Sequence, residues 1–556
     1  TNVDGSALSS ALTLTGSSAV NAITGGAGND IIDGAGGADV IVAGGGNDTV
    51  TYRGTEASMD GGSGTDTLVL AAGGGITTID FSVAAGLDQT AGDGVSVLNF
   101  EYLNASALSS ALTIIGSSAA NTITAGSGND VIDGGGGADV IAAGAGDDTV
   151  TYHGSESSID GGAGTNTLVL ASAVTVNLGN ADQTSADGAN VSNFHNVDAS
   201  GLSTGVSITG SFAANTLTGG TGNDTIDGGG GADVIHAGGG NDTVVYHGSE
   251  SSIDGGGGTN TLVMASAVTV NLGNGDQTSG DATAVTNFHN VDASTQSSDL
   301  SITGSSTANS ITGGTGNDSI DGGGGLDVIA AGGGNDTVTY HGTESSIDGG
   351  SGTNTLVLTT AASVNLANGD QTGGDSTAVS NFSNIDGSAL SSALTLTGSA
   401  GANSITGGAG NDTINGGGGL DHLFGGDGND LFIIDHASLA LGSTINGGSG
   451  YNSVNISSGN VADTELLAAL TNVQSIDFTA SGVNASLNLS GSQISQMDGG
   501  ASNTLTLNLN TGDSFNLTDA AANYTTNTAG NTTTYTIYDD ASQSHLVAHV
   551  AVSMVA

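Results

Sequence analysis

The sequence predicts an all-β fold in which short parallel strands stack into a β-roll, or β-solenoid, followed by a small β-rich C-terminal region. Three observations predict it. A nine-residue pattern runs through residues 25–51 as GGAGNDIID, GAGGADVIV and AGGGNDTVT. Thr, Val, Ile and Leu alternate with polar residues along most of the chain. Aromatic residues make up only 3% of the chain, so ladders of aliphatic side chains must form the core.

Each position of the nine-residue pattern has its own physical role. Glycine in the fourth position permits the positive φ of a tight turn. The last three residues form a short strand whose β-branched residue, in the eighth position, points inward. Two nonapeptides make one coil, so Asp30 lies above Asp48 along one edge. A flexible Gly/Asp-rich linker would not keep an aliphatic residue in a fixed position, which argues against that alternative.

The aspartates of the sixth position are the predicted metal ligands. Carboxylates stacked in a column repel one another unless a cation lies between them. Carboxylate and turn carbonyl oxygens are hard ligands, which suit Ca²⁺ better than a softer metal. The predicted ligands are Asp30, Asp39, Asp48, Asp66, Asp130, Asp139, Asp148, Asp224, Asp233, Asp242, Asp318, Asp327, Asp336, Asp412, Asp421 and Asp430.

At these residues the chain resembles the RTX (repeats-in-toxin) family, whose nonapeptide is GGxGxDxUx. The resemblance implies a parallel β-roll that folds around several Ca²⁺ ions after secretion. The nonapeptide block occurs five times, with equivalent aspartates about 94 to 100 residues apart. We therefore expect repeats 1 to 4 at residues 1–103, 104–197, 198–291 and 292–385, a partial repeat 5 at 386–454, and a C-terminal assembly or secretion region at 455–556.

The residues that follow each block vary in an informative way. The aspartate position of the next turn holds Asp66 in repeat 1 but asparagine in repeats 2 to 4, which predicts the edge of the metal column there. Glu56, Glu156, Glu250 and Glu344 either complete the last Ca²⁺ sites or form an exposed polar turn. His153, His247 and His341 are too far apart to share an ion, and Arg53 takes their position in repeat 1. We therefore expect a plain surface or turn role for them.

The segments between blocks predict further coils without Ca²⁺ turns. Residues 174–184 alternate with period two, which indicates a half-buried strand and a turn. Asparagines in the repeated NFHNV segments are expected to bond to neighbouring turns in a ladder. Residues 461–470 are the only convincing helical stretch, with Asp463 as a possible N-cap. The last residues predict strands and a hairpin, and resemble the uncleaved secretion region of type I exported RTX proteins.

Charge and composition exclude several classes of function. The formal net charge is −53 with one basic residue, Arg53, so the chain has no cationic surface for nucleic acid or for direct membrane insertion. Cysteine is absent, so disulfides are impossible. No run of 18 apolar residues indicates a membrane span. Motifs of zinc proteases and nucleotide-binding proteins are absent, and no hydrolase motif lies in the structural context that it needs. The sequence therefore predicts a protein that is not an enzyme. Because the sequence begins with Thr, we expect a processed, truncated or partial chain.

These features predict an extracellular, Ca²⁺-dependent structural protein that assembles with copies of itself at the cell surface, as a lattice or filament. The repeats resemble those of RTX surface-layer proteins of alphaproteobacteria, which implies type I secretion and attachment to surface polysaccharide. Their regularity suggests an elongated rod with head-to-tail contacts. The alternative is the repeat stalk of an RTX adhesin without its ligand-binding tip. A toxin or hydrolase carrier would need a catalytic domain that this sequence does not contain.

Overall fold

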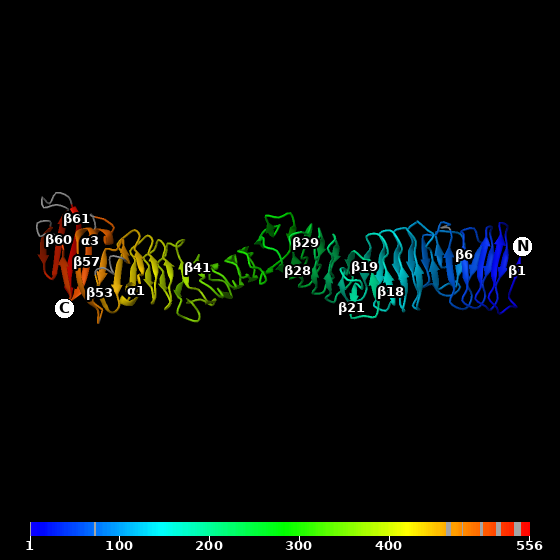
Figure 1. Cartoon of the computed structure of the whole chain (residues 1–556), viewed down its shortest axis with the longest axis horizontal. Coiled ribbons are helices and arrows are strands. Elements are labelled where there is room, and N and C mark those ends of the chain that lie inside the picture. The colour runs from blue at the N-terminus through cyan, green and yellow to red at the C-terminus, as the bar shows by residue number, and fades with distance from the viewer. Residues whose placement is uncertain are drawn as a thin grey trace. The chain divides into compact units, whose positions relative to one another are not determined.

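A computed structural model describes residues 2–71, 74–462, 469–480, 482–500, 504–518, 524–538 and 546–555. The chain divides into two compact units, and Figure 1 labels strands of both. Unit 1 comprises residues 1–266 and 275–288, and unit 2 comprises residues 267–274 and 289–556. Both units consist almost entirely of short strands, most of them paired in parallel, as the predicted β-roll requires.

The first nonapeptide block of unit 1 shows how one coil is built. Strand β4 (Ile31–Ala35) lies between β2 (Thr13–Ser17) and β6 (Thr49–Tyr52), and all three are parallel. Ile32 is in register with Leu14 on one side and with Val50 on the other. The intervening strands form an equivalent parallel sheet on the opposite side of the coil. They are β3 (Ala22–Thr24), β5 (Val40–Val42) and β7 (Ser58–Asp60). Two nonapeptides thus complete one coil, as predicted.

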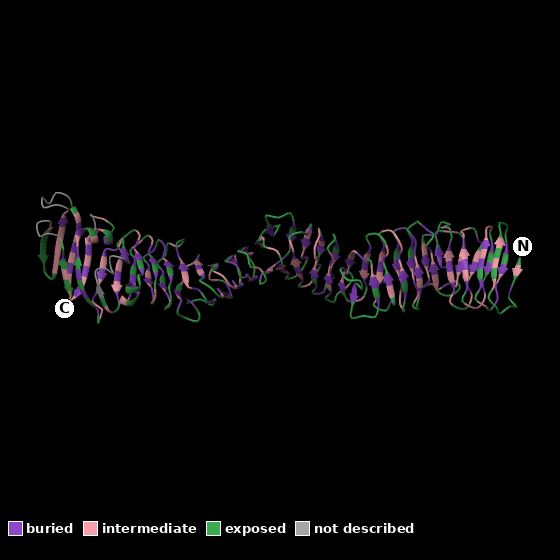
Figure 2. Ribbon diagram, viewed as in Figure 1, coloured by how far each residue is buried: buried purple, intermediate pink, exposed green. Residues whose placement is uncertain are grey.

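The core of each unit is a ladder of single aliphatic residues, one from the centre of each strand. Ile32, Ile41 and Val50 are fully buried, as are Ile23, Met59 and Leu68 in the same ladders. Buried and exposed residues alternate along the short strands (Figure 2). Apolar burial at about 25 cal/mol per Å² is the main favourable contribution to such a core. The chain therefore obtains its core from the repeat, as the low aromatic content predicted.

Segments between the nonapeptide blocks, which we call junctions, end one sheet and start another. In the first junction, residues 71–104, strand β11 (Ser96–Leu98) pairs with β7 and completes that sheet. Strand β9 (Thr78–Asp80) starts a new sheet, pairing in parallel with β13 (Thr113–Ile115) and antiparallel with β10 (Thr90–Ala91). The predicted coils without nonapeptide turns are therefore present, but in the first, second and fourth junctions the new sheet also carries an antiparallel strand that periodicity did not predict. The pairs in the second and fourth junctions are β20 (Thr175–Asn177) with β21 (Thr184–Ser185), and β42 (Ser363–Asn365) with β43 (Thr372–Gly373).

Unit 2 continues the same architecture and ends in longer strands. Strand β57 (Thr504–Asn510) pairs in parallel with β61 (Leu546–Val555). Strand β60 (Thr532–Tyr538) lies antiparallel between β61 and β59 (Tyr524–Ala529). The predicted terminal strands and hairpin are thus confirmed within the described residues.

The helix prediction was wrong in part. Strand β53 (Asn460–Ala462) takes the first two residues of the predicted helix and β54 (Leu470–Thr471) the last. Ala469 is helical, as predicted, and residues 463–468, with Asp463, lie outside the described residues. The described helices are α1 (His436–Leu441), capped by Asp435, and α3 (Gly491–Asp498), which has a Ser490–Gln493 capping box. Their capping residues were the available signal. No helix in the described part of the chain is long and apolar enough to cross a membrane.

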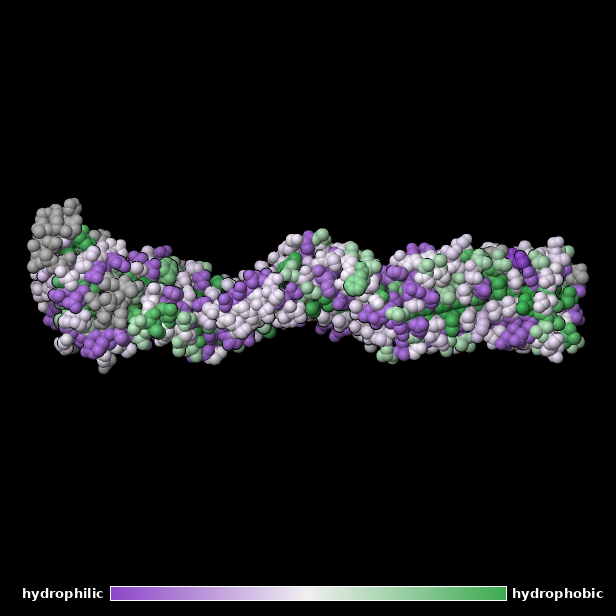
Figure 3. Space-filling model, in the orientation of Figure 1, coloured by the Kyte–Doolittle hydropathy of each residue, from purple (hydrophilic) through white to green (hydrophobic). Residues whose placement is uncertain are grey.

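The surface is mixed in character. On the face seen in Figure 3, small groups of hydrophobic residues lie among hydrophilic ones. Exposed aliphatic side chains include Ile31, Val40, Val131 and Val140, which occupy the first position of their strands. Single exposed apolar residues of this kind are ordinary on a protein surface.

Candidate metal centre

The predicted aspartates all occupy one structural position. Each accepts, through Oδ1, the backbone N–H of the residue 18 positions earlier, one coil away. The N···O distance is 2.7 Å from Asn21 to Asp39 and 2.7 Å from Asp30 to Asp48. The bond from Asp48 to Asp66 extends this column to the next coil. The structure therefore brings the aspartates of alternate nonapeptides together in columns.

The second carboxylate oxygen distinguishes the first aspartate of each block from the others. In the first aspartates, Oδ2 accepts a glycine N–H, as in the bond from Gly26 to Asp30 at 2.7 Å. The remaining aspartates are buried, and their Oδ2 atoms have no hydrogen-bond partner in the described part of the chain. They are Asp39, Asp48, Asp66, Asp139, Asp148, Asp233, Asp242, Asp327, Asp336, Asp421 and Asp430. Because an unpaired buried carboxylate is very unfavourable, these oxygens require a proton or a cation.

Electrostatics in the absence of metal agree with that requirement. Burial raises the pKa of Asp66 to about 7, and the charges of Asp48 and Glu101 contribute to the rise. Burial likewise raises the pKa of Asp233 and Asp430 to about 6, with Glu250 and Asp412 as the respective nearby charges. The same cause raises the pKa of Asp48, Asp130, Asp139, Asp148, Asp242, Asp318, Asp327, Asp336 and Asp421. A bound cation would reverse this preference for the neutral form.

The donor set fits Ca²⁺. No group of three or more His, Cys, Asp or Glu side chains within the described ranges is arranged to hold a metal ion, so the aspartates would need backbone carbonyl oxygens as co-ligands. Ca²⁺ accepts such mixed oxygen ligands readily. The turns bring backbone groups very close: Gly144 has φ +106°, and a Cβ there would lie 2.1 Å from the Gly126 oxygen. The aspartate columns with their glycine turns would therefore hold the ions, which neutralise the buried charge.

Asparagine replaces aspartate where the column ends in repeats 2 to 4. Asn166 Oδ1 accepts the N–H of Asp148 at 2.9 Å, in the same way as Asp66 accepts that of Asp48. Its Nδ2 donates to the carbonyls of Gly161 at 2.7 Å and Asn193 at 3.0 Å. Asparagine therefore keeps the column geometry and satisfies the position without a cation.

The four glutamates of the series led by Glu56 close a turn. Glu56 is buried and accepts the N–H groups of Arg53, Gly54 and Thr55. Glu156 and Glu250 make the same three bonds in their repeats. The expectation of an exposed polar turn was wrong, because backbone donors need a buried acceptor at this place.

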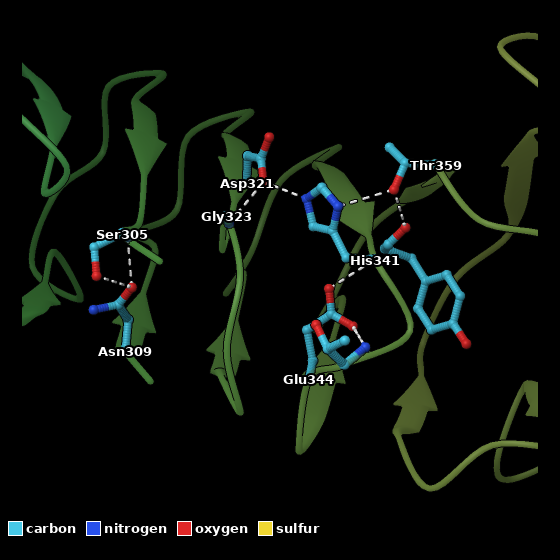
Figure 4. A network of polar contacts seen from close by, with 9 residues as sticks. Ser305, Asn309, Asp321, Gly323, His341, Glu344 and Thr359 are labelled. Atoms are coloured by element: carbon cyan, nitrogen blue, oxygen red, sulfur yellow. Dashed lines mark hydrogen bonds and ion pairs between the residues drawn. The ribbon is translucent and has the colours of Figure 1, made fainter. Parts of the chain in front are cut away.

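His341 and its equivalents form a repeated ion-pair position. His341 Nε2 lies 2.8 Å from Asp321 Oδ1 of the preceding coil, Nδ1 lies 2.9 Å from Thr359 Oγ1, and the backbone N–H donates to Glu344 (Figure 4). His153 and His247 contact Asp133 and Asp227 in the same way. In repeat 1, Arg53 makes a bidentate pair with Asp33. The geometry agrees with a structural surface role.

Two buried residues that make bonds in the junctions were missed by sequence reasoning. Gln183 is buried; its Nε2 donates to the carbonyls of Leu178 and Phe194, and its Oε1 accepts the Phe194 N–H. Tyr152 donates to Asp187 Oδ2 at 2.5 Å; burial first, and then this bond, raise the tyrosine pKa. Both residues recur in the repeats, as Gln89, Gln277 and Gln371 and as Tyr52, Tyr246 and Tyr340. That recurrence was the signal that could have identified them.

Asparagine ladders were predicted correctly. Asn196 Oδ1, from an NFHNV segment, accepts the N–H of Thr216 one coil later at 2.8 Å. Asn290 and Asn384 make the equivalent bonds. Inside the blocks, Asn29 Oδ1 accepts the N–H of Asn47 in the same manner.

Comparison with protein families gives a match to the family described as RTX calcium-binding nonapeptide repeat (4 copies). The match covers residues 15–50, 115–150, 209–244, 303–338 and 397–432, which contain the first three aspartates of each block. Comparison with curated proteins gave no match. The family's repeats bind Ca²⁺ at multiple sites, as the geometry of the aspartate columns requires.

Proposed function

Because five segments of this chain are RTX calcium-binding repeats, we propose that it is a secreted structural protein of the bacterial surface. Its fold would depend on Ca²⁺, and its copies would assemble into a lattice or filament. In this proposal the chain is not an enzyme. Export by type I secretion would precede folding, since Ca²⁺ outside the cell would neutralise the aspartate columns. Surface polysaccharide is the proposed anchor.

The observation that carries the assembly proposal is an unpaired strand edge in unit 1. Strand β2 has five residues and pairs with β4 on one side; among the described strands it has no other neighbour. Ile31 N–H donates to the Leu12 carbonyl, so the alternate residues Thr13 and Thr15 direct their backbone groups away from β4. Neither lysine nor proline blunts this edge. An edge of this kind pairs readily with a strand of another chain.

Electron microscopy in millimolar Ca²⁺ tests the proposal with a matched pair of variants. Thr13→Lys places a charge on the unpaired edge and should abolish ordered assemblies of the full chain. Thr113→Lys is the control, because Thr113 is equally exposed but β13 is paired on both sides. It should assemble as the wild type does.

Two outcomes would contradict the proposal. If the wild type stays dispersed in Ca²⁺, the chain does not assemble by itself, and the adhesin-stalk alternative becomes the better account. If both lysine variants assemble normally, the β2 edge is not the contact. Circular dichroism in Ca²⁺ must show that each variant is folded.

A further inference from the structure

The four junctions share a short acidic motif that lies outside both the aspartate columns and the family match. It reads DQTAGD at residues 88–93, DQTSAD at 182–187, DQTSGD at 276–281 and DQTGGD at 370–375. The matched segments end in the blocks and contain none of these residues. The glutamine of the motif bonds to the backbone of its own junction, which leaves one threonine and two aspartates in each copy without a structural task.

Both aspartates of the motif are fixed in place through one carboxylate oxygen. In the second junction, Asp182 Oδ1 accepts the Val191 N–H at 3.1 Å, and Asp187 Oδ2 accepts the Tyr152 hydroxyl at 2.5 Å. Burial, then the bond to Asp187, and then the charges of Asp187, Glu156 and Asp182 raise the pKa of Tyr152, so both aspartates lie near its hydroxyl. The equivalent pairs of bonds are Asp88 with Val97 and Asp93 with Tyr52, Asp276 with Val285 and Asp281 with Tyr246, and Asp370 with Val379 and Asp375 with Tyr340.

The threonine of the motif places a buried hydroxyl between the two aspartates. Thr184 is 3% exposed, and its Oγ1 has no hydrogen-bond partner in the described part of the chain. Its direction follows from its strand, because Thr184 is in antiparallel register with Val176 as Thr90 is with Ile79 in the first junction. A buried hydroxyl without a partner is unfavourable, so this oxygen calls for a ligand from outside the chain.

In the first junction, the oxygens around the threonine are spaced like the ligands of one cation. Thr90 Oγ1 lies 3.2 Å from Asp88 Oδ1, 3.3 Å from Asp93 Oδ1 and 3.5 Å from the Val95 carbonyl oxygen. A hydroxyl has one hydrogen, so it can donate to only one of these three acceptors. At Ca²⁺–oxygen distances of about 2.4 Å, two ligands at right angles lie about 3.4 Å apart. Similar distances of 3.3–3.5 Å join the hydroxyls of Thr278 and Thr372 to the second aspartate and to a carbonyl oxygen of their junctions.

We propose that each of the four junctions binds one Ca²⁺ ion through the two aspartates and the threonine of this motif, with water and a backbone carbonyl as the other ligands. In the second junction the side-chain ligands are Asp182, Thr184 and Asp187. Hard oxygen donors of mixed type suit Ca²⁺. Both aspartates are exposed, so water already solvates their charge and the junction folds without the ion. Because Asp187 is bonded to Tyr152, the ion would fasten the junction to the last strand of the preceding block.

Equilibrium dialysis of the full chain in millimolar CaCl₂ tests the site by counting bound Ca²⁺. The variant Asp93→Asn/Asp187→Asn/Asp281→Asn/Asp375→Asn should bind four ions fewer than the wild type. It should fold, because an asparagine oxygen can still accept the tyrosine hydroxyl. The control, Asp198→Asn/Asp292→Asn/Asp386→Asn, removes junction acids that each accept a serine N–H nearby, and should leave the count unchanged.

A second variant tests the hydroxyl itself. Thr90→Val/Thr184→Val/Thr278→Val/Thr372→Val keeps the shape of the buried side chains and both carboxylates, but removes one ligand from each site. It should bind fewer ions than the wild type at the same free Ca²⁺ concentration. A wild-type count in either the asparagine or the valine variant, with circular dichroism showing a folded chain, would overturn the proposal. Neither count depends on whether the chain assembles, so the outcome is separable from that of the proposed function.

Discussion

The nonapeptide blocks and the junctions solve the same problem of buried polar groups in opposite ways. In the blocks, Asp148 and its equivalents keep one carboxylate oxygen buried without a hydrogen-bond donor among the described residues. In the junctions, Gln183 bonds to Phe194, and Asp187 accepts the hydroxyl of Tyr152 at the end of the preceding block. The carboxylates of the blocks therefore need a cation, whereas the buried Gln183 of the junction is satisfied by bonds within the chain. This difference makes Ca²⁺ a condition of folding for one part of the coil and not for the other.

Junctions and blocks alternate along the chain, so each junction can guide the folding of the block that follows it. Each junction starts a new sheet on a strand such as β9, and that sheet then enters the next block. A junction thus supplies a paired edge on which the following block stacks. Coils in a solenoid are stabilised mainly by their neighbours, so folding should propagate from coil to coil once Ca²⁺ is present.

Chelation of Ca²⁺ should produce the largest difference in stability between the blocks and the junctions. Removing Ca²⁺ with EDTA at neutral pH leaves the columns of buried carboxylates uncompensated, so the blocks should unfold. Far-UV circular dichroism and native-state hydrogen exchange should show loss of structure first at block amides such as Asp48 and later at junction amides such as Phe194. Equal exchange in both regions, or an unchanged spectrum, would contradict the cation requirement.

Acid should partly replace Ca²⁺ in the blocks. Burial raises the pKa of Asp66 to about 7 and that of Asp233, Asp327, Asp421 and Asp430 to about 6, above the ordinary value of 3.8. The folded, metal-free chain then binds more protons than the unfolded chain between about pH 4 and 7. Its stability should be greatest below pH 4 and fall as the pH rises to about 7. Thermal unfolding in EDTA at pH 4.5 and pH 7.5 measures this, and saturating Ca²⁺ should abolish the trend.

The periodicity predicted more of the blocks than of the junctions, for a physical reason. The column from Asp30 through Asp48 follows from a nine-residue period and two strands per coil, which are local properties of the sequence. The pairing of Tyr152 with Asp187 joins residues 35 positions apart through a loop whose path no short period describes. The turn closed by Glu56 likewise depends on three successive N–H groups converging, which composition does not reveal.

The junctions can be weakened without touching the metal columns. Gln183→Ala removes two donated bonds and one accepted bond, leaving the carbonyls of Leu178 and Phe194 and the Phe194 N–H with fewer partners. We expect a loss of about 3 kcal/mol in the free energy of unfolding, measured by urea titration in Ca²⁺. Asn180→Ala, at an exposed position of the same turn, is the control. The Ca²⁺ count should not change, and a lost ion would mean that junction and block are not independent.

The repeated ion pair should have the smallest effect. His247 Nε2 lies 2.7 Å from Asp227 Oδ1, but both side chains are about one-third exposed, so water screens the pair. His247→Gln should therefore change the free energy of unfolding by less than about 1 kcal/mol in Ca²⁺. Arg53→Gln is the matched variant, since Arg53 makes two bonds to Asp33 in the same position. If His247→Gln proved as destabilising as Gln183→Ala, the histidines would belong with the buried junction contacts and not with the solvated surface of the blocks.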